Sequence, residues 1–377
     1  MQGVNSVALD AFRYVFAILI VILSHGGHRR ISPLPALATF SLLTVNAIFL
    51  VKGTYGLQLD LFKPIVGLVS ILLAFLISFR PWTFQPMLAG LTVGGLASAV
   101  DILLQYFGMP YIGMENTFGL RYSGLSFSST NTAPLLGLAS LAVIQGAPLK
   151  GACKNWLLRS VLVCILVSGM WISGGRGGFI AFSAALILMA ITRMPPIATV
   201  VMLAMAGIYA LTAISFSSAL DALLRVEERA NAGGGTPDIT SGRVEFNAVT
   251  WNAFADNPFF GPPISELDLL QPHTPVLLLA VQAGIIGLAA ALLVLTLVIY
   301  RLFCPSRRVG DKTLIRSYAV VILIVSALEP NGFFVGIGKT VILMIVLSGN
   351  LGLHQRASTL PQAKSSPPMT VAHKIRR

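Results

Sequence analysis

The stretch TPVLLLAVQAGIIGLAAALLVLTLVIY, residues 274–300, contains no charged side chain. In an α-helix, about 20 apolar residues cross the hydrocarbon core of a bilayer, which is roughly 30 Å thick. Because lipid offers backbone amides and carbonyls no hydrogen-bonding partner, such a stretch satisfies them internally as a helix. The stretch therefore predicts a membrane-spanning helix, and similar stretches recur along most of the chain.

The composition of the whole chain agrees with this interpretation. Of its 377 residues, 55% are hydrophobic and 11% are charged, and the mean hydropathy is +0.81. A soluble domain of this length needs more charge to cover its surface, and the short alternating stretches of a membrane β-barrel do not occur. We predict an all-α fold: a polytopic transmembrane helical bundle with about 11–12 helices and one long loop containing short helices.

Apolar runs that we expect to span the membrane share the length and low charge of the first. They lie at approximately 8–24, 34–51, 64–79, 86–107, 131–147, 157–175, 176–192, 196–216, 274–300, 317–332 and 336–353.

The positive charges predict the orientation of these spans. The net charge is +12, but the basic residues fall between apolar runs, so they indicate topology and not a nucleic-acid-binding surface. The connector 301–316 and the tail 354–377 are the richest in Lys and Arg, and we expect both on the cytoplasmic side. Alternating back from there places four connectors on the outer side: 52–63, 108–130, 173–177 and 217–273.

Segment 217–273 differs from its surroundings because it holds eight of the fourteen acidic residues. We therefore divide the chain into an N-terminal transmembrane bundle (1–216), an outer loop that could hold a site (217–273), C-terminal transmembrane helices (274–353) and a disordered basic cytoplasmic tail (354–377). Within the loop, SGRVEFNAVTWNAFA predicts a helix, because apolar residues recur every three or four positions after a capping Ser241. We expect this helix to lie along the membrane surface.

His273 stands at the boundary between the loop and the next span. Of the five histidines, it is the one that the predicted topology places outside. An imidazole has an ordinary pKa near neutral, so it can take a proton from a hydroxyl and return it. The alternative is that His273 only caps or anchors the helix that begins at Thr274 and Pro275.

Arg176 lies in SGGRGGF, between two apolar runs. A guanidinium is costly in hydrocarbon, so one interpretation is that it reaches the interface from a tight helical hairpin. The other interpretation is an anion site, because Arg binds phosphate oxygens with two hydrogen bonds and the flanking glycines let another molecule approach the backbone.

Two further arginines face outward in the predicted topology. Arg243 opens the predicted surface helix, where it is either a solvated charge, paired with Glu245 or Glu227, or part of a site. Arg121, in GLRYSGLSFSSTNTA, either belongs to a site or holds its polar loop onto the helix that starts near Asn131.

Asp101 lies within a predicted span, and an acid there is a functional candidate. A transporter or flippase would use it to couple an ion. No Walker sequence, GxSxG, HExxH or Asp-rich cluster occurs in the sequence, so an enzyme built on this chain is expected to work without a metal.

Taken in order, these stretches resemble the O-antigen ligase and O-antigen polymerase family of bacterial inner-membrane glycosyltransferases. SGGRGG (173–178) is similar to an SRG-like arginine motif, RVEFNAVTWNAFADNPFFG (243–261) to an R…W……NP..G stretch, and HTPVLLLAVQAGIIGL (273–288) to the family's HN..L motif. Upstream, RYSGLSFSSTNTA resembles the loop R.sG.f.npN.a. The chain departs from the pattern at Gly175, where Ser is usual, at Thr274, where Asn is usual, and at Pro262 and Pro263, where a second glycine is common.

The resemblance implies a GT-C-like, metal-independent glycosyltransferase in the bacterial inner membrane, with its active site on the periplasmic side. It would transfer a glycan from an undecaprenyl-diphosphate carrier in the membrane lipid to an acceptor hydroxyl on another glycan or on lipid A-core. Arg176 and Arg243 would bind the diphosphate, Arg121 would contact the donor, and His273 would be the general base. No cofactor and no nucleic-acid partner are expected. Ligase and surface-polysaccharide polymerase remain alternatives, as do a transporter or flippase using Asp101 and a non-catalytic assembly subunit.

Overall fold

The computed structural model describes most of the predicted bundle. The described residues are 33–55, 62–78, 84–112, 122–125, 129–146, 155–193, 243–267, 270, 272–304, 309–329, 332–334 and 337–348. The predicted spans 8–24 and 196–216, the loop start 217–242 and the tail 354–377 lie outside them.

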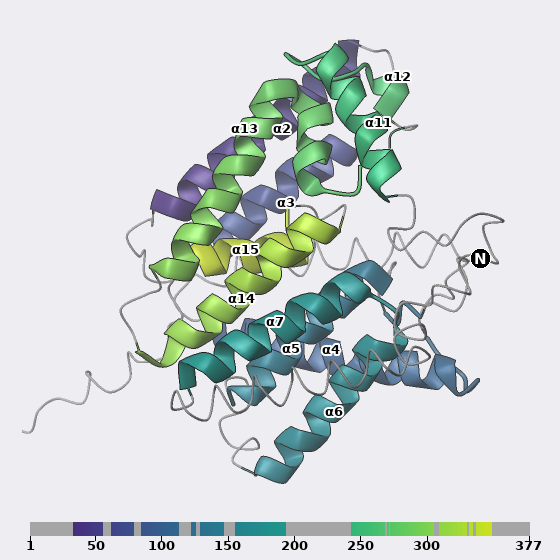
Figure 1. Ribbon diagram of the computed structural model, residues 1–377, viewed down its shortest axis with the longest axis vertical. Helices are drawn as coiled ribbons and strands as arrows, with labels where there is room; N and C mark the ends of the chain where they lie inside the picture. Colours follow the sequence, from purple (N-terminus) through teal and green to yellow (C-terminus); the bar gives the residue numbers. More distant parts are fainter. Residues whose placement is uncertain are drawn as a thin grey trace, which may run out of the picture.

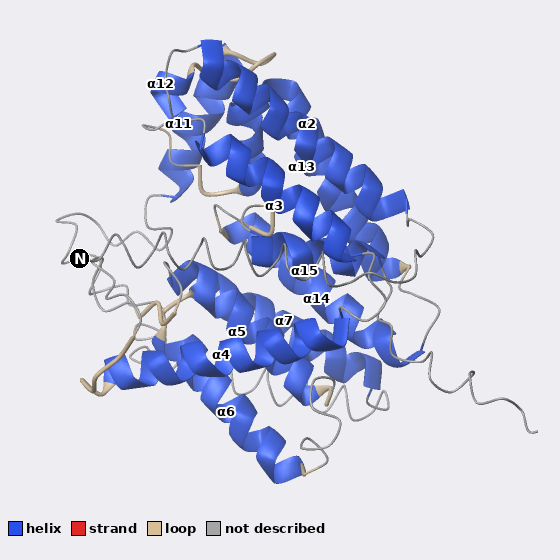
Figure 2. Ribbon diagram, turned by 180° about the vertical axis from the view of Figure 1, so that it is seen from behind, coloured by secondary structure: helices blue, strands red, loops and turns tan. Residues whose placement is uncertain are grey.

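The described residues form α-helices joined by loops, and no strand is drawn among them (Figures 1 and 2). The helices are α2 (Pro33–Tyr55), α3 (Phe62–Ser78), α4 (Phe84–Tyr106), α5 (Ser129–Ile144), α6 (Trp156–Ile172), α7 (Arg176–Arg193), α11 (Arg243–Asp256), α12 (Ile264–Leu267), α13 (Pro275–Phe303), α14 (Val309–Leu328) and α15 (Ile337–Ser348). The prediction of an all-α fold is confirmed for this part of the chain.

Among the described residues, three helices have both the length and the apolar composition to cross a membrane: Pro33–Lys52, Met87–Tyr106 and Pro275–Phe303. Shorter apolar helices of 10–17 residues accompany them in α3, α5, α6, α7 and α15. The protein is therefore a helical membrane protein, as its hydropathy predicts.

The helices pack in two groups with α14 and α15 between them (Figure 1). On one side, α5 contacts α4, α6 and α7, and on the other α2 contacts α3 and α13. Helix α14 packs against α7 and α13, while α15 packs against α2 and α3. Residues distant in sequence therefore share one continuous apolar core.

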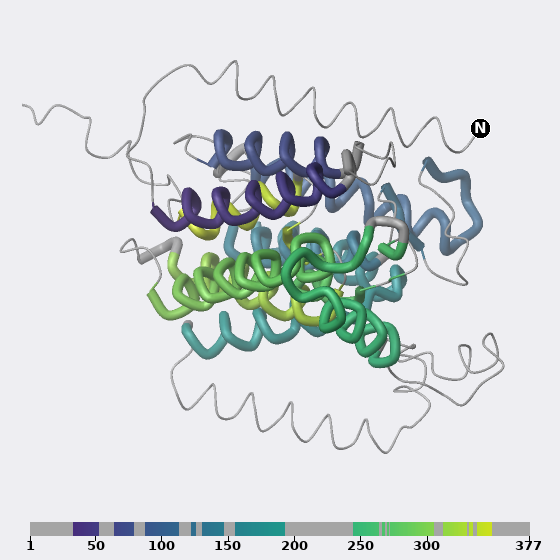
Figure 3. The backbone as a smooth tube through the Cα atoms, turned by 90° about the horizontal axis from the view of Figure 1, so that it is seen from above, coloured from purple at the N-terminus to yellow at the C-terminus, as the bar shows by residue number. Residues whose placement is uncertain are grey.

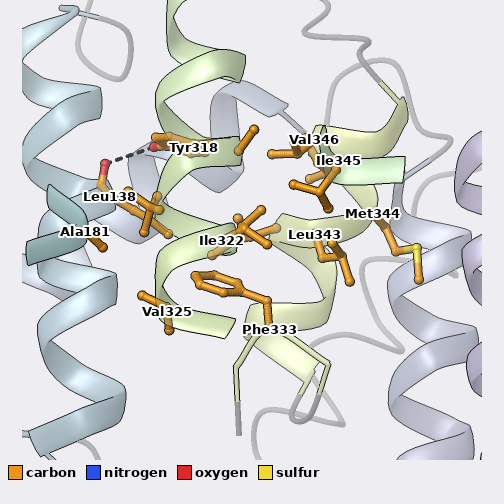
Figure 4. Packing of buried hydrophobic residues seen from close by; sticks show 14 of the residues in the cluster. Leu138, Ala181, Tyr318, Ile322, Val325, Phe333, Leu343, Met344, Ile345 and Val346 are labelled. Carbon is orange, nitrogen blue, oxygen red and sulfur yellow. Dashed lines mark hydrogen bonds between the residues drawn. The ribbon is translucent and has the colours of Figure 1, made fainter. Parts of the chain in front are cut away.

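The middle of this core shows how α14 is held (Figure 4). Tyr318 is fully buried, and its hydroxyl donates to the Leu138 carbonyl of α5 at 2.9 Å. Burying a hydroxyl without a partner costs about 1–3 kcal/mol, so this bond favours one register of α14 on α5. Ile322 and Phe333 continue the apolar packing beside it.

The ends of the helices gather into two sets. At one end, which we call the α11 end, Lys52 of α2 contacts the turn after α11, and Lys339 of α15 contacts Asn131 of α5. At the opposite end, Arg301 Nε of α13 donates to the Leu347 carbonyl of α15 at 2.8 Å. Figure 3 shows the helices side by side, with α11 beyond one set of ends. This grouping agrees with the predicted alternation of spans; which end faces the cytoplasm stays a prediction.

Two helices differ from what hydropathy predicts. Helix α14 begins at Val309 and not near 317, because polar residues can continue a helix beyond its apolar part. Helix α13 is interrupted at Ala283 (φ −138°, ψ 21°) and Gly284 (φ 62°, ψ −143°), although its sequence there contains no charged residue and no proline. The interruption separates a two-turn segment at the α11 end, 275–282, which we call the outer segment of α13, from the longer remainder of the helix, which we call its inner segment.

Candidate active site

His273 immediately precedes α13, and the helix is capped by its neighbour. Thr274 has extended backbone angles and its hydroxyl accepts from the Leu277 N–H at 3.3 Å, while Pro275 occupies the first helical turn. This is the usual start of a helix, since Thr supplies the cap acceptor and Pro lacks an N–H that would go unsatisfied. The capping role that the sequence left open for His273 therefore belongs to Thr274.

Helix α11 holds His273 from the other side. The Asn247 side-chain oxygen accepts from the His273 backbone N–H at 2.9 Å, and the Phe246 ring lies 5.5 Å from the imidazole, centroid to centroid. The ring nitrogen Nδ1 is buried, while the residue as a whole is half-buried. The histidine is thus fixed in the seam between α11 and α13.

Arg243 is the first residue of α11. It precedes Asn247 by four residues, a spacing that places two helical positions on the same face. The predicted surface helix 241–255 is confirmed as a helix, with bounds Arg243–Asp256. Several of its apolar side chains are exposed, among them Val244, Val249 and Trp251.

Arg176 opens α7 after a sharp hairpin with α6. Gly174 has φ 69°, a left-handed conformation that favours glycine, and its carbonyl accepts from the Arg176 N–H at 3.1 Å. A Cβ at Gly177 would meet the Glu329 carboxylate, and one at Gly178 would meet the α5 backbone at Pro134. These two glycines therefore allow close packing within the protein, which differs from our prediction that the flanking glycines admit another molecule.

Two residues that follow α14 lie against the starts of α7 and α13. Glu329, at the end of α14, lies against Gly177, the second residue of α7. Gly332 donates to the Glu329 carbonyl at 3.2 Å and lies against the Pro275 ring. Helix α7, which Arg176 opens, and helix α13, which His273 precedes, therefore each contact one of these two residues.

Two buried charged residues lie at this end of the bundle. Glu329 is 2% exposed and Lys339 is 7% exposed, and the Lys339 ammonium donates to the Asn131 side-chain oxygen at the start of α5. Burial of a charge is favourable only when hydrogen bonds or an opposite charge compensate it. The α11 end thus contains a polar interior within an otherwise apolar bundle.

Arg121 lies outside the described residues, but the residues that follow it are described. The Ser123 carbonyl accepts from the Thr132 hydroxyl at 2.7 Å, and the Tyr122 ring lies 6.0 Å from that of Tyr106. Segment 122–125 therefore packs between the end of α4 and the start of α5, at the α11 end.

Asp101 has structural partners within its own segment. Its two carboxylate oxygens accept from the Gln105 amide at 2.8 Å and from the Ile112 N–H at 2.7 Å. These bonds tie the end of α4 to the chain that leaves it. They give the buried carboxylate a role that requires no transported ion.

Three residues near this site were not singled out by sequence reasoning: Asn247, Lys339 and Lys52. Two of them carried a usable signal. Lys339 is a cation within the apolar run 336–353, and Lys52 is a basic residue on the predicted outer side, against the usual bias. Asn247 has no comparable signal, because its contact with His273 joins residues 26 positions apart.

Part of the chain matches a known protein family. The O-antigen ligase family model matches residues 161–262, a region that begins in α6, contains α7 and α11, and ends in the turn after α11. It includes Arg176 and Arg243 and stops before His273. No curated protein matches the chain. The match confirms the resemblance predicted from the sequence: residues 161–262 are similar to the O-antigen ligase family.

Proposed function

We propose that this protein is a metal-independent glycosyltransferase of the bacterial inner membrane. The family match indicates a membrane enzyme that transfers glycans. We further propose that the donor is an undecaprenyl-diphosphate-linked glycan, that the acceptor is a hydroxyl on a glycan or on lipid A-core, and that transfer takes place on the periplasmic face.

The observation that carries this proposal is the meeting of two helix starts at one turn. Helix α7, which Arg176 opens, lies against Glu329, and helix α13, which follows His273, lies against Gly332. A helix start carries unpaired N–H groups and partial positive charge, so an adjoining arginine adds to a site that favours an anion. A cation and a base at the same end of the bundle suit a reaction with an anionic leaving group.

The leaving group in such a transfer is a lipid diphosphate. Negative charge grows on its bridging oxygen as the bond to the anomeric carbon breaks, and guanidinium groups stabilise that charge by paired hydrogen bonds. We assign this role to Arg176 and Arg243, and a further donor contact to Arg121. Two guanidinium groups supply the positive charge that a metal ion would otherwise provide.

His273 would act on the acceptor as general base. The acceptor oxygen forms a bond to the anomeric carbon, its proton passes to the imidazole, and the electron pair of the broken bond leaves with the diphosphate. Asn247 and Phe246 support this role, because they hold the backbone and the ring of the histidine from α11. A base at the end of a membrane helix lies where a donor held in lipid can meet an acceptor hydroxyl that is exposed to water.

The test compares glycan transfer by the wild type with that of His273→Ala and Arg176→Ala, at equal protein levels in the membrane. Removing a general base typically costs a factor of about 10²–10⁴ in rate, so we expect product to fall by at least the lower figure. Arg159→Ala is the matched control, because Arg159 lies at the opposite end of the bundle, against Gly146. Wild-type product from both site variants would refute the proposal.

Ligase and polymerase are distinguished by what accumulates when the gene is deleted. Carrier-bound repeat units that stay unpolymerised would identify a polymerase. Long polymer that never reaches lipid A-core would identify a ligase.

A further inference from the structure

Lys52, at the end of the membrane-spanning part of α2, contacts four backbone carbonyls of another part of the chain. Its ammonium lies 2.7 Å from the Phe260 oxygen and 2.9 Å from the Pro262 oxygen, in the turn after α11. It also lies 3.2 Å from the Gln282 oxygen and 3.4 Å from the Val281 oxygen, in α13. One side chain therefore joins three elements.

The α13 carbonyls are available because the helix is interrupted. In a continuous helix the Val281 carbonyl would accept from the N–H of Ile285, four residues later. Here the Ile285 N–H donates instead to the Pro258 carbonyl, at 2.7 Å. The interruption thus exchanges an internal bond of α13 for a bond to the turn after α11, and Lys52 binds the carbonyl that was released.

The turn fits into the interruption at two glycines. Gly284 has φ 62° and lies directly against the Phe259 carbonyl, while Gly261 has φ 74° and lies against the Val281 carbonyl. A Cβ at either position would overlap a backbone oxygen. Residues 258–262 are therefore packed backbone to backbone with the interruption in α13. Lys52, from α2, donates to carbonyls of both parts.

From this geometry we infer that Lys52 is a positioning residue for His273. The outer segment of α13, 275–282, has only two turns, begins directly after His273 and ends at the carbonyls that Lys52 binds. Lys52 also holds the turn that follows α11, whose Asn247 binds the His273 backbone. The expected effect of Lys52 on glycan transfer rests on the proposed function of His273. Its expected effect on the placement of α11 relative to α13 does not.

The chemistry of the ammonium suits this position. It has three N–H donors and carries a full charge, and hydrogen bonds from a charged donor are about twice as strong as neutral ones. Buried backbone carbonyls are costly without hydrogen-bond donors, so irregular backbone packed inside the protein needs partners from the protein. A methionine of similar length would fill the space and leave the carbonyls unsatisfied.

The experiment measures the distance between α11 and the inner segment of α13. Spin labels are placed at Val249 and Leu292, which are both exposed, in a full-length protein whose native cysteines are replaced by serine. We expect a single narrow distance distribution for the parent protein, a broad or shifted one for Lys52→Met, and recovery of the narrow one in Lys52→Arg. Lys312→Met, which removes a lysine from the start of α14, serves as the matched control and is expected to match the parent.

An unchanged distribution in Lys52→Met overturns the inference. If that variant does not fold, Lys52→Gln, which keeps an uncharged donor, takes its place under the same criterion. Transfer measured in parallel is expected to fall on the order of 10²-fold in Lys52→Met, with the KM for the donor unchanged, because misplacing a reacting group by about 1 Å has this effect.

The two measurements separate the inference from the proposed function. Loss of transfer with an unchanged distance would also overturn the positioning role, since Lys52 would then act on the substrate. A broadened distance distribution in Lys52→Met, together with normal transfer by His273→Ala, would support the role of Lys52 in holding the segment. It would refute the catalytic role of His273.

Discussion

Gly178, the third residue of α7, provides a direct test of how Arg176 is placed. Its Cα lies so close to α5 that a Cβ at this position would stand 2.5 Å from the Pro134 nitrogen and 2.6 Å from the Ala133 carbonyl carbon. Both neighbours are backbone atoms of a helix, which cannot rotate away. Gly178→Ala must therefore move the start of α7 away from α5.

The size of the effect follows from these distances. Ordinary contacts of a Cβ begin at 3.4 Å, so the added methyl group is about 0.9 Å too close to Pro134. Overpacking of this kind typically costs about 1–3 kcal/mol of stability. Because Arg176 is two residues earlier in the same helical turn, a shift approaching 1 Å is expected to lower transfer on the order of 10²-fold if the guanidinium binds the leaving group.

The assay measures glycan transfer in membrane vesicles together with the melting temperature in detergent. Gly90→Ala and Gly94→Ala are the matched controls, since both glycines lie in α4 and nothing lies within 4 Å of a Cβ at either position. We expect these controls to keep wild-type transfer and wild-type or higher stability. Wild-type transfer and stability in Gly178→Ala would refute the reasoning, because the close approach of α7 and α5 would then have no consequence.

Three further predictions concern the same end of the molecule. Asn247→Leu removes the acceptor for the His273 N–H. It is expected to lower transfer by roughly 5- to 150-fold, because an unsatisfied buried donor costs about 1–3 kcal/mol and about 1.4 kcal/mol is tenfold. Asn247→Asp keeps an acceptor and should retain most of the transfer; equal rates in the two variants would exclude this role of the amide. Asp101→Asn is expected to leave the amount of surface glycan unchanged. Asn keeps an oxygen for the Ile112 N–H, and the Gln105 amide can turn to present its oxygen to the new amide. Loss of all surface glycan at a normal protein level would favour a transporter. Extensive treatment of the purified protein with EDTA is expected to leave transfer unchanged, and a loss that added Mg²⁺ or Mn²⁺ restores would contradict the metal-independent mechanism.

Hydropathy predicted most helices of the described bundle well, for a physical reason. The span 34–51 lies within α2, the span 86–107 agrees with α4 to within two residues at each end, and the division near residue 175 separates α6 from α7. These features depend on local composition, since each helix satisfies its own backbone in lipid. The beginning of α13 was likewise predictable, because the Thr-Pro pair that follows His273 carries its own capping signal.

The interruption of α13 could not be predicted in this way. VQAGIIGL, residues 281–288, has one polar residue, Gln282, and no charge, and it resembles part of a continuous span. The helix departs from regular geometry at Gly284 because the carbonyl of Phe259, 25 residues earlier, occupies the space beside it. A pattern read along one segment contains no information about a backbone oxygen supplied by another.

The lysines at the α11 end also bear on which cations bind the diphosphate. Lys52 directs its three donors at four backbone carbonyls, and the Lys339 ammonium is buried against Asn131. Withdrawing either ammonium to bind a substrate would leave protein oxygens unsatisfied in a region of low dielectric constant, which costs several kcal/mol. The structural use of both lysines therefore argues against either of them as a partner of the proposed donor. The planar fork of Arg176, at the start of a helix, also matches the oxygens of a diphosphate better than a point charge does.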